Sequence, residues 1–184
     1  MKTVAILYGW SEGPWHTKKL ATHLKAEGFN IINDVKTADV ILAHSLGCYM
    51  LPANVKAKKI VLIGIPYWPG RSIVDSLIHN LRLEAKQRRG FTWWLNRSIH
   101  AAFYILLRSP YTIKGLRKRS KLKFNLPPKN TDVVLIRNEL DGFCHPDIQK
   151  LIPKLSKYSL KQLPGGHEDW WINPKTYVDI LKKL

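Results

Sequence analysis

The stretch around Ser45 has the residue types and spacing of an activated serine. The apolar run 40–43 is typical of a short buried strand, and the small residues after it predict a tight turn into a helix. A serine on such a turn projects its hydroxyl above the carboxyl edge of a parallel sheet, and Gly47 lets the helix pack closely. This predicts a nucleophile elbow, although a serine N-cap on an ordinary strand-to-helix turn explains the same residues.

The segment Ala43-His44-Ser45-Leu46-Gly47 resembles the G-x-S-x-G motif of the α/β-hydrolase family, with alanine in the first glycine position. Two later segments also resemble that family. Residues 138–146 are similar to its acid turn, with Asp141 at the acid position, and residues 163–169 are similar to its histidine loop. The resemblance implies a catalytic triad of Ser45 as nucleophile, His167 as base and Asp141 as orienting acid.

Other acids and histidines compete for these roles. Glu139 is the nearest alternative to Asp141, and Asp169 is a weaker one. His44 is a common neighbour of the serine in the resembling family and receives no catalytic role. Four further histidines lack a motif, and His23 is expected on a helix surface; the four are His16, His79, His100 and His145.

The loop after the first strand, Tyr8-Gly9-Trp10, takes the place where the family usually has His-Gly. By this match, the backbone N–H groups of Trp10 and Leu46 form the oxyanion hole, which stabilises charge that develops only in the transition state. A plain Gly/Pro turn over residues 9–14 is the alternative.

The elements that would position these residues follow from hydrophobic patterning. Residues 15–27 predict an amphipathic helix that ends at Gly28, and Asn173 and Pro174 suit the start of a C-terminal helix. Strands are expected at 4–8, 29–33, 40–43, 59–65, 131–137 and 159–163. Only residues 34–38 separate the second and third strands, too few for a crossover helix. We therefore expect a trimmed, mostly parallel α/β-hydrolase sheet of five or six strands flanked by helices.

Residues 71–128 do not have the pattern of a sheet. Apolar residues recur at helical spacing near 73–81 and again over 92–108. In the family a helical cap is inserted at this position, so the resemblance implies one domain, 1–184, in which residues 71–128 form a cap over the nucleophile. Trp68, Trp94 and Phe103 are candidate substrate-pocket residues. Packing of a helical hairpin on the sheet explains such aromatic residues equally well.

The positive charge is concentrated in this insertion. The chain carries a formal net charge of +17, and residues 71–128 hold 13 Lys/Arg against 2 Asp/Glu. Such a surface favours anionic partners: an acidic membrane, an anionic substrate or nucleic acid. The most basic segment, 114–123, has no nucleic-acid motif beside it, so nucleic acid is the least favoured, and a solvated face is the simplest alternative.

Compartment and cofactors are expectations of the same kind. Met1-Lys2-Thr3 runs straight into a strand with no signal peptide visible, and no apolar run is long enough to span a membrane, which predicts a cytoplasmic protein that could act at a membrane surface. Cys48 and Cys144 lack metal-ligand spacing and are expected as free thiols. The resemblance implies no cofactor or metal.

The sequence thus predicts a serine hydrolase that cleaves a carboxylic ester, with a thioester or an amide as further options. A non-catalytic binding protein on a hydrolase fold and an anionic-membrane or nucleic-acid binder acting through the basic insertion remain as alternatives.

Overall fold

The computed structural model describes residues 1–10, 12–67, 69–87, 90, 91, 94, 95, 99, 124, 125, 127, 128 and 130–182. Most of the predicted helix 92–108, the whole basic segment 114–123, and the pocket candidates Trp68 and Phe103 lie outside these residues. The single-domain organisation with an inserted cap therefore stays a prediction.

Six parallel strands form one sheet in the order β2-β1-β3-β4-β5-β6. The chain starts in the interior of the sheet and turns out to the edge strand β2, and the rest of the sheet is then built on the other side of β1. The strands are β1 (Lys2–Leu7), β2 (Phe29–Ile32), β3 (Val40–His44), β4 (Lys59–Ile63), β5 (Asp132–Leu140) and β6 (Ser159–Gly166). The prediction of five or six mostly parallel strands is confirmed.

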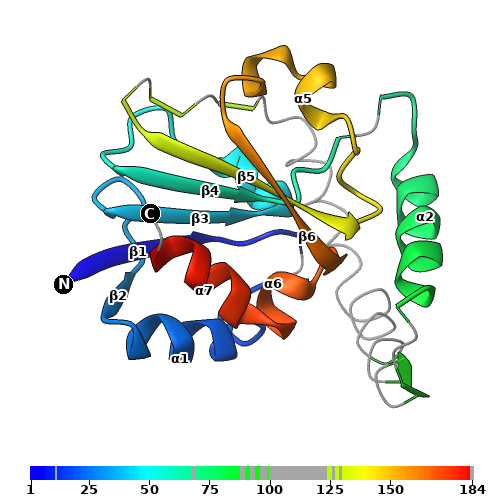
Figure 1. The fold of residues 1–184 in the computed structure, drawn as a ribbon, viewed down its shortest axis with the longest axis horizontal. Coiled ribbons are helices and arrows are strands. Elements are labelled where there is room, and N and C mark those ends of the chain that lie inside the picture. The colour runs from blue at the N-terminus through cyan, green and yellow to red at the C-terminus, as the bar shows by residue number, and fades with distance from the viewer. Residues whose placement is uncertain are drawn as a thin grey trace.

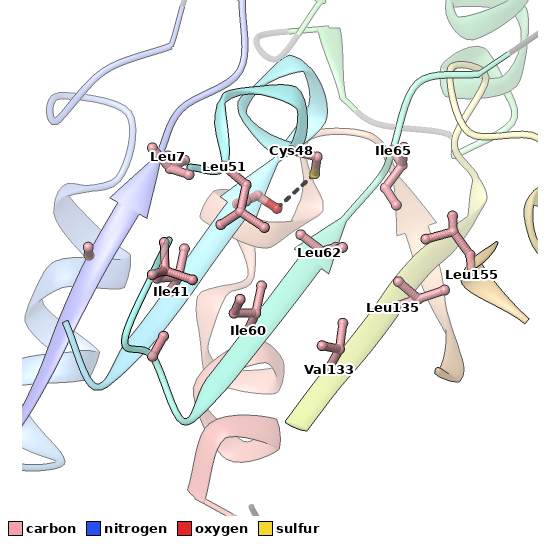
Figure 2. Packing of buried hydrophobic residues seen from close by; sticks show 14 of the residues in the cluster. Leu7, Ile41, Cys48, Leu51, Ile60, Leu62, Ile65, Val133, Leu135 and Leu155 are labelled. Atoms are coloured by element: carbon pink, nitrogen blue, oxygen red, sulfur yellow. Dashed lines mark hydrogen bonds between the residues drawn. The ribbon is translucent and has the colours of Figure 1, made fainter. Parts of the chain in front are cut away.

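The central strands are buried on both faces because alternate residues face two separate cores. On one face Ile41, Ile60, Leu62 and Leu135 pack together (Figure 2) beneath the 3-10 helix η1 (Ser45–Met50), α5 (Ile148–Leu151) and the 3-10 helix η2 (Pro153–Leu155). On the other face Leu42 and its neighbours pack against α1 (Lys18–Ala26), α6 (Asp169–Ile172) and α7 (Pro174–Lys182), which lie together in Figure 1.

Helix α2 (Ile73–Ala85) belongs to the insertion between β4 and β5 and lies beyond the carboxyl ends of the strands (Figure 1). Its start is fixed by Ser72, whose hydroxyl accepts a hydrogen bond from the Asp75 N–H at 3.1 Å. This is an ordinary N-cap, which satisfies one of the free amides of the first turn. The helical pattern near 73–81 is confirmed.

Other boundaries differ from the predictions. No helix joins β2 to β3, as expected from the short connection. The predicted start of the acid turn is wrong, because β5 continues through Leu140 instead of ending at Arg137. The predicted start of the histidine loop is also wrong, because β6 continues to Gly166. The pairing of β5 with β6 shifts register between Asn138 and Leu140, which accommodates the glycines at the end of β6. In the described residues, no helix is long and apolar enough to cross a membrane.

Candidate active site

Ser45 lies on a strained turn between β3 and η1. Its φ is 52°, and it is the only described non-glycine residue with positive φ. Such a conformation costs free energy for an L-residue and persists only where the surroundings impose it. Gly47 shows how close the surroundings are: a Cβ there would lie 2.2 Å from the carbonyl oxygen of Leu7, at the end of β1. The serine is therefore presented by a tight bend against the neighbouring strand.

The structure brings Asp141 and His167 together. Asp141 follows β5, His167 follows β6, and His167 Nδ1 lies 2.9 Å from Asp141 Oδ1. Both residues are buried. The same carboxylate oxygen accepts hydrogen bonds from the backbone N–H groups of Phe143 at 2.9 Å and Cys144 at 3.1 Å. Donation from Nδ1 leaves Nε2 as the nitrogen available to take up a proton.

The two groups shift each other's pKa. Burial alone would lower the pKa of His167, but the charge of Asp141, the hydrogen bond to it and the charge of Glu12 raise that pKa above its usual value. For Asp141, burial alone would raise the pKa, but the charge and hydrogen bond of His167 and the Phe143 amide hold it below its usual value. The pair therefore favours an ionised carboxylate beside an imidazole that readily accepts a proton.

The competing acids lie elsewhere. Glu139 is exposed. Asp169 is buried, but its carboxylate accepts hydrogen bonds from Asn173 Nδ2 at 3.2 Å. Of the three acids considered, Asp141 is the one whose carboxylate contacts His167.

Ser45 and His167 are linked through a common neighbour rather than by a direct hydrogen bond. Among the described residues, the Ser45 hydroxyl donates no hydrogen bond to the His167 ring. The residue before the serine, His44, has its ring centroid 4.5 Å from that of His167. Catalytic hydrogen bonds are commonly long without substrate, so the lack of a direct Ser45–His167 hydrogen bond in the free protein is compatible with proton transfer in a complex.

Gly64, at the end of β4, leaves room for the acid and the base. Its φ is +56°, and a Cβ there would lie 2.7 Å from Asp141 Oδ2 and 3.2 Å from His167 Nδ1. Any larger residue would push on both partners at once.

The oxyanion-hole candidates are backbone amides of two segments beside the serine. Leu46 lies in the first turn of η1, where amides have no partner within the helix. Trp10 follows Gly9, whose N–H donates to Glu12 Oε2 at 2.7 Å. A Cβ on Gly9 would lie 2.9 Å from the Ser45 Cβ, so this loop passes directly over the serine. Their role in binding an oxyanion stays a prediction.

Several residues that support the site were missed by the sequence analysis. The Glu12 carboxylate accepts the Gly9 N–H and also contacts the ring of His44. On α2, Asn80 Oδ1 accepts the N–H of Gly142 at 3.0 Å. The only sign of these roles in the sequence is that Glu12 and Asn80 are polar residues in a turn and in an apolar segment. Their partners, His44 and Gly142, are 32 and 62 residues away in the chain.

A further buried amide steadies the histidine loop. Asn138 Nδ2 donates to the carbonyl oxygen of Gly166 at 2.6 Å, and Asn138 Oδ1 accepts from the Tyr177 hydroxyl at 2.9 Å. The residue directly before His167 is thereby tied to both β5 and α7.

Two surface cavities have no residue of the candidate triad in their lining. One, of about 450 Å³, is lined by Pro69, Gly70, Arg71, Asp75 and His145. The other, of about 690 Å³, lies among α1, α6 and α7. The remaining described pocket candidate, Trp94, is half-buried and lines neither cavity. Among the described residues, no three His, Cys, Asp or Glu side chains are grouped as a metal site requires.

Comparison with known proteins gives structural neighbours only. No family model matches the sequence, and no curated protein matches it either. The solved structures that resemble it include a bromoperoxidase from Bacillus anthracis, with a TM-score of 0.66, 12% identity and coverage of 98% of this chain and 90% of the other. This chain has the α/β-hydrolase fold.

Two further structures with the α/β-hydrolase fold match over the whole chain. An esterase from Exiguobacterium antarcticum has a TM-score of 0.65 at 11% identity, and a thioesterase domain from the curacin biosynthetic pathway has 0.62 at 13%. Each match covers 100% of this chain and 91% of the other. On this α/β-hydrolase fold, the three candidate residues follow β3, β5 and β6, at the carboxyl edge where ligands of parallel sheets bind.

Proposed function

We propose that this protein is a serine hydrolase that cleaves carboxylic esters through an acyl-enzyme on Ser45. The observation that carries the proposal is the buried 2.9 Å contact between His167 Nδ1 and Asp141 Oδ1. It is supported by the strained turn that presents Ser45 and by the α/β-hydrolase fold, whose neighbours include an esterase and a thioesterase.

In the first half of the reaction, Ser45 Oγ attacks the ester carbonyl carbon while His167 Nε2 takes the hydroxyl proton. The N–H groups of Trp10 and Leu46 stabilise the negative charge on the carbonyl oxygen, and removing one such donor typically costs about 2.7 to 4 kcal/mol. The carbon–oxygen bond to the leaving alkoxide then breaks, and His167 gives that alkoxide its proton. Asp141 stabilises the imidazolium between these steps.

In the second half, a water molecule attacks the acyl carbon and gives a proton to His167. The bond to Ser45 breaks, the serine recovers its proton, and the carboxylic acid leaves. Thioesters and amides follow the same route with a thiolate or an amine as the leaving group. Whether the enzyme is of the carboxylesterase or the lipase type depends on the residues over the serine, and we propose a small-molecule ester as the primary substrate.

The test is covalent labelling of Ser45 with a fluorophosphonate probe, followed by intact mass and peptide mapping. The wild type should gain one adduct on Ser45, and Ser45→Ala should gain none. Ser156→Ala removes a serine hydroxyl from an exposed position and is the matched control, which should label like the wild type. Hydrolysis of p-nitrophenyl acetate should follow the labelling pattern.

A folded wild type that does not label would refute the enzymatic proposal and favour a binding protein on a hydrolase fold. Repeating the reaction with anionic liposomes tests the basic insertion in the same experiment. Labelling that rises with liposomes would support action of the hydrolase at a membrane surface, whereas liposome binding by an unlabelled protein would favour the binding alternative.

A further inference from the structure

The ring of His44 has an oxygen partner at each nitrogen. Nδ1 lies 2.8 Å from Glu12 Oε1 and 2.9 Å from Glu12 Oε2, and Nε2 lies 2.9 Å from the carbonyl oxygen of His167. A carbonyl oxygen can only accept, so Nε2 carries a hydrogen and donates it. The Glu12 carboxyl is the hydrogen-bond partner of Nδ1. Both nitrogens of the ring are therefore held, one by the Glu12 side chain and one by the His167 backbone.

Polar groups at this place need partners, because the His44 side chain has no exposed surface. Glu12 supplies one of them, and its own side chain is almost fully covered. Burial alone would raise the pKa of Glu12, but the charge and hydrogen bond of His44, the charge of His167 and the Gly9 N–H hold it below its usual value. Glu12 and His44 thus form a buried hydrogen-bonded pair.

One end of this pair holds the loop over the serine. Glu12 Oε2 accepts the N–H of Gly9 at 2.7 Å and so holds the backbone directly before Trp10, the oxyanion candidate. A Cβ on Gly9 would meet Glu12 Oε2 at 2.8 Å and Ser45 Cβ at 2.9 Å. The carboxylate and the serine therefore both lie against the loop backbone at Gly9, and the hydrogen bond from Glu12 holds that backbone beside the serine.

The other end of the pair holds the base. His44 Nε2–H donates to the backbone oxygen of His167, and the two rings contact each other with centroids 4.5 Å apart. Trp170, which has no exposed surface, stacks on the His44 ring at 4.7 Å. The backbone of the base is thereby tied to the residue that directly precedes the nucleophile.

We propose that the Glu12–His44 pair is a positioning device that sets the oxyanion loop and the His167 backbone relative to Ser45. The catalytic part of this inference rests on the proposed function, whereas the hydrogen bonds of the pair are features of the structure itself. Neither residue forms or breaks a bond in the proposed reaction. Their effect on rate comes from the alignment of groups that do, and a misplacement of about 1 Å can cost about 100-fold.

Two measurements test the proposal. The first is NMR of the His44 ring N–H, assigned from the spectrum of His44→Gln, with its exchange with solvent as the readout. In the wild type the Nε2–H should exchange slowly, because it is buried and donates to the His167 carbonyl, and in Glu12→Gln it should exchange faster. A wild-type His44 N–H that exchanges as fast as that of the exposed His23 would overturn the pairing.

The second measurement is the rate of fluorophosphonate labelling at several probe concentrations, which separates the inactivation rate constant from the probe affinity. Each variant is assayed well below its unfolding temperature. Glu12→Gln should lower the inactivation rate constant by up to about 100-fold with little change in probe affinity. The double variant with His44→Gln should lose little more than either single variant, because the two residues act as a unit. Glu27→Gln, which breaks a surface ion pair with Lys182, is the matched control and should label like the wild type.

Labelling of Glu12→Gln at the wild-type rate would overturn the positioning role. If the wild type itself does not label, the proposed function fails and the positioning role fails with it, while the NMR result still decides whether Glu12 and His44 are paired.

Discussion

Replacement of Gly47 by alanine tests the geometry of the nucleophile turn most directly. The added Cβ would lie 2.2 Å from the Leu7 carbonyl oxygen and 2.8 Å from that of Tyr8. Both obstacles are backbone atoms, so no side-chain rotation relieves the contact. Reaching even 3.0 Å from Leu7 requires the two segments to separate by 0.8 Å, and Tyr8 leads directly into the loop that carries Trp10.

Two magnitudes result from this displacement. Overpacking of this kind typically costs about 1 to 3 kcal/mol. At roughly 2 to 4 °C per kcal/mol for a chain of this size, the melting temperature should fall by about 2 to 12 °C. Movement of the oxyanion loop by nearly 1 Å should also slow fluorophosphonate labelling of Ser45 by about 100-fold.

Gly90→Ala is the matched control, since a Cβ at Gly90 meets no atom of the described residues within 4 Å. Thermal unfolding followed by circular dichroism and labelling at a temperature where all three proteins are folded provide the two readouts. Gly90→Ala should match the wild type in both. If Gly47→Ala unfolds and labels like Gly90→Ala, the close contact between the turn and β1 is refuted.

Three further outcomes are expected from other parts of the site. Asp141 holds the pKa of His167 above its usual value, and the base must be neutral, so labelling of Ser45 should fall as the pH drops through that raised pKa. In Asp141→Asn an NMR titration should place the His167 pKa lower. An unchanged titration would contradict the pairing. Asn80→Leu leaves a buried N–H of the acid turn without its acceptor and should lower the free energy of unfolding in urea by about 1 to 3 kcal/mol, so an unchanged midpoint would argue against that hydrogen bond. Burial raises the pKa of the Cys48 and Cys144 thiols, so Ellman's reagent should detect both only after unfolding, and rapid reaction of the native protein would show that they are exposed.

The sheet and the three candidate residues were predictable from sequence because their signals are local. Buried strands read as short apolar runs, and the elbow, the acid turn and the histidine loop each occupy a few consecutive residues. The strand boundaries near Leu140 and Gly166 were wrong because strand pairing continued through residues that favour turns. Tertiary hydrogen bonds outweighed local preference there.

The supporting contacts could not be predicted because they join distant segments. Glu12 and His44 are 32 residues apart, and Asn80 and Gly142 are 62 apart. Each residue taken singly resembles an ordinary loop or helix residue. Their roles depend on the sheet order, which brings the loop after β1 beside β3 and places α2 at the carboxyl ends of the strands.

The hydrogen bond between Asn80 and the acid turn also determines how separable the insertion is from the rest of the fold. A Cβ at Gly142 would lie 2.3 Å from the Asn80 Cα, and one at Gly166 would lie 2.2 Å from Gln87 Nε2. The region from α2 to Gln87 therefore packs against the turns on both sides of the candidate acid and base. Deleting or exchanging residues 71–128 as a block would expose the backbone beneath Asp141 and His167. Phe124 packs on Tyr49, and Asn125 Nδ2 donates to the Leu51 carbonyl at 2.9 Å, so the end of the insertion is also tied to the core. A chimera that replaces only residues 88–123 preserves all of these contacts, so the usable boundaries for exchange lie after Gln87 and before Phe124.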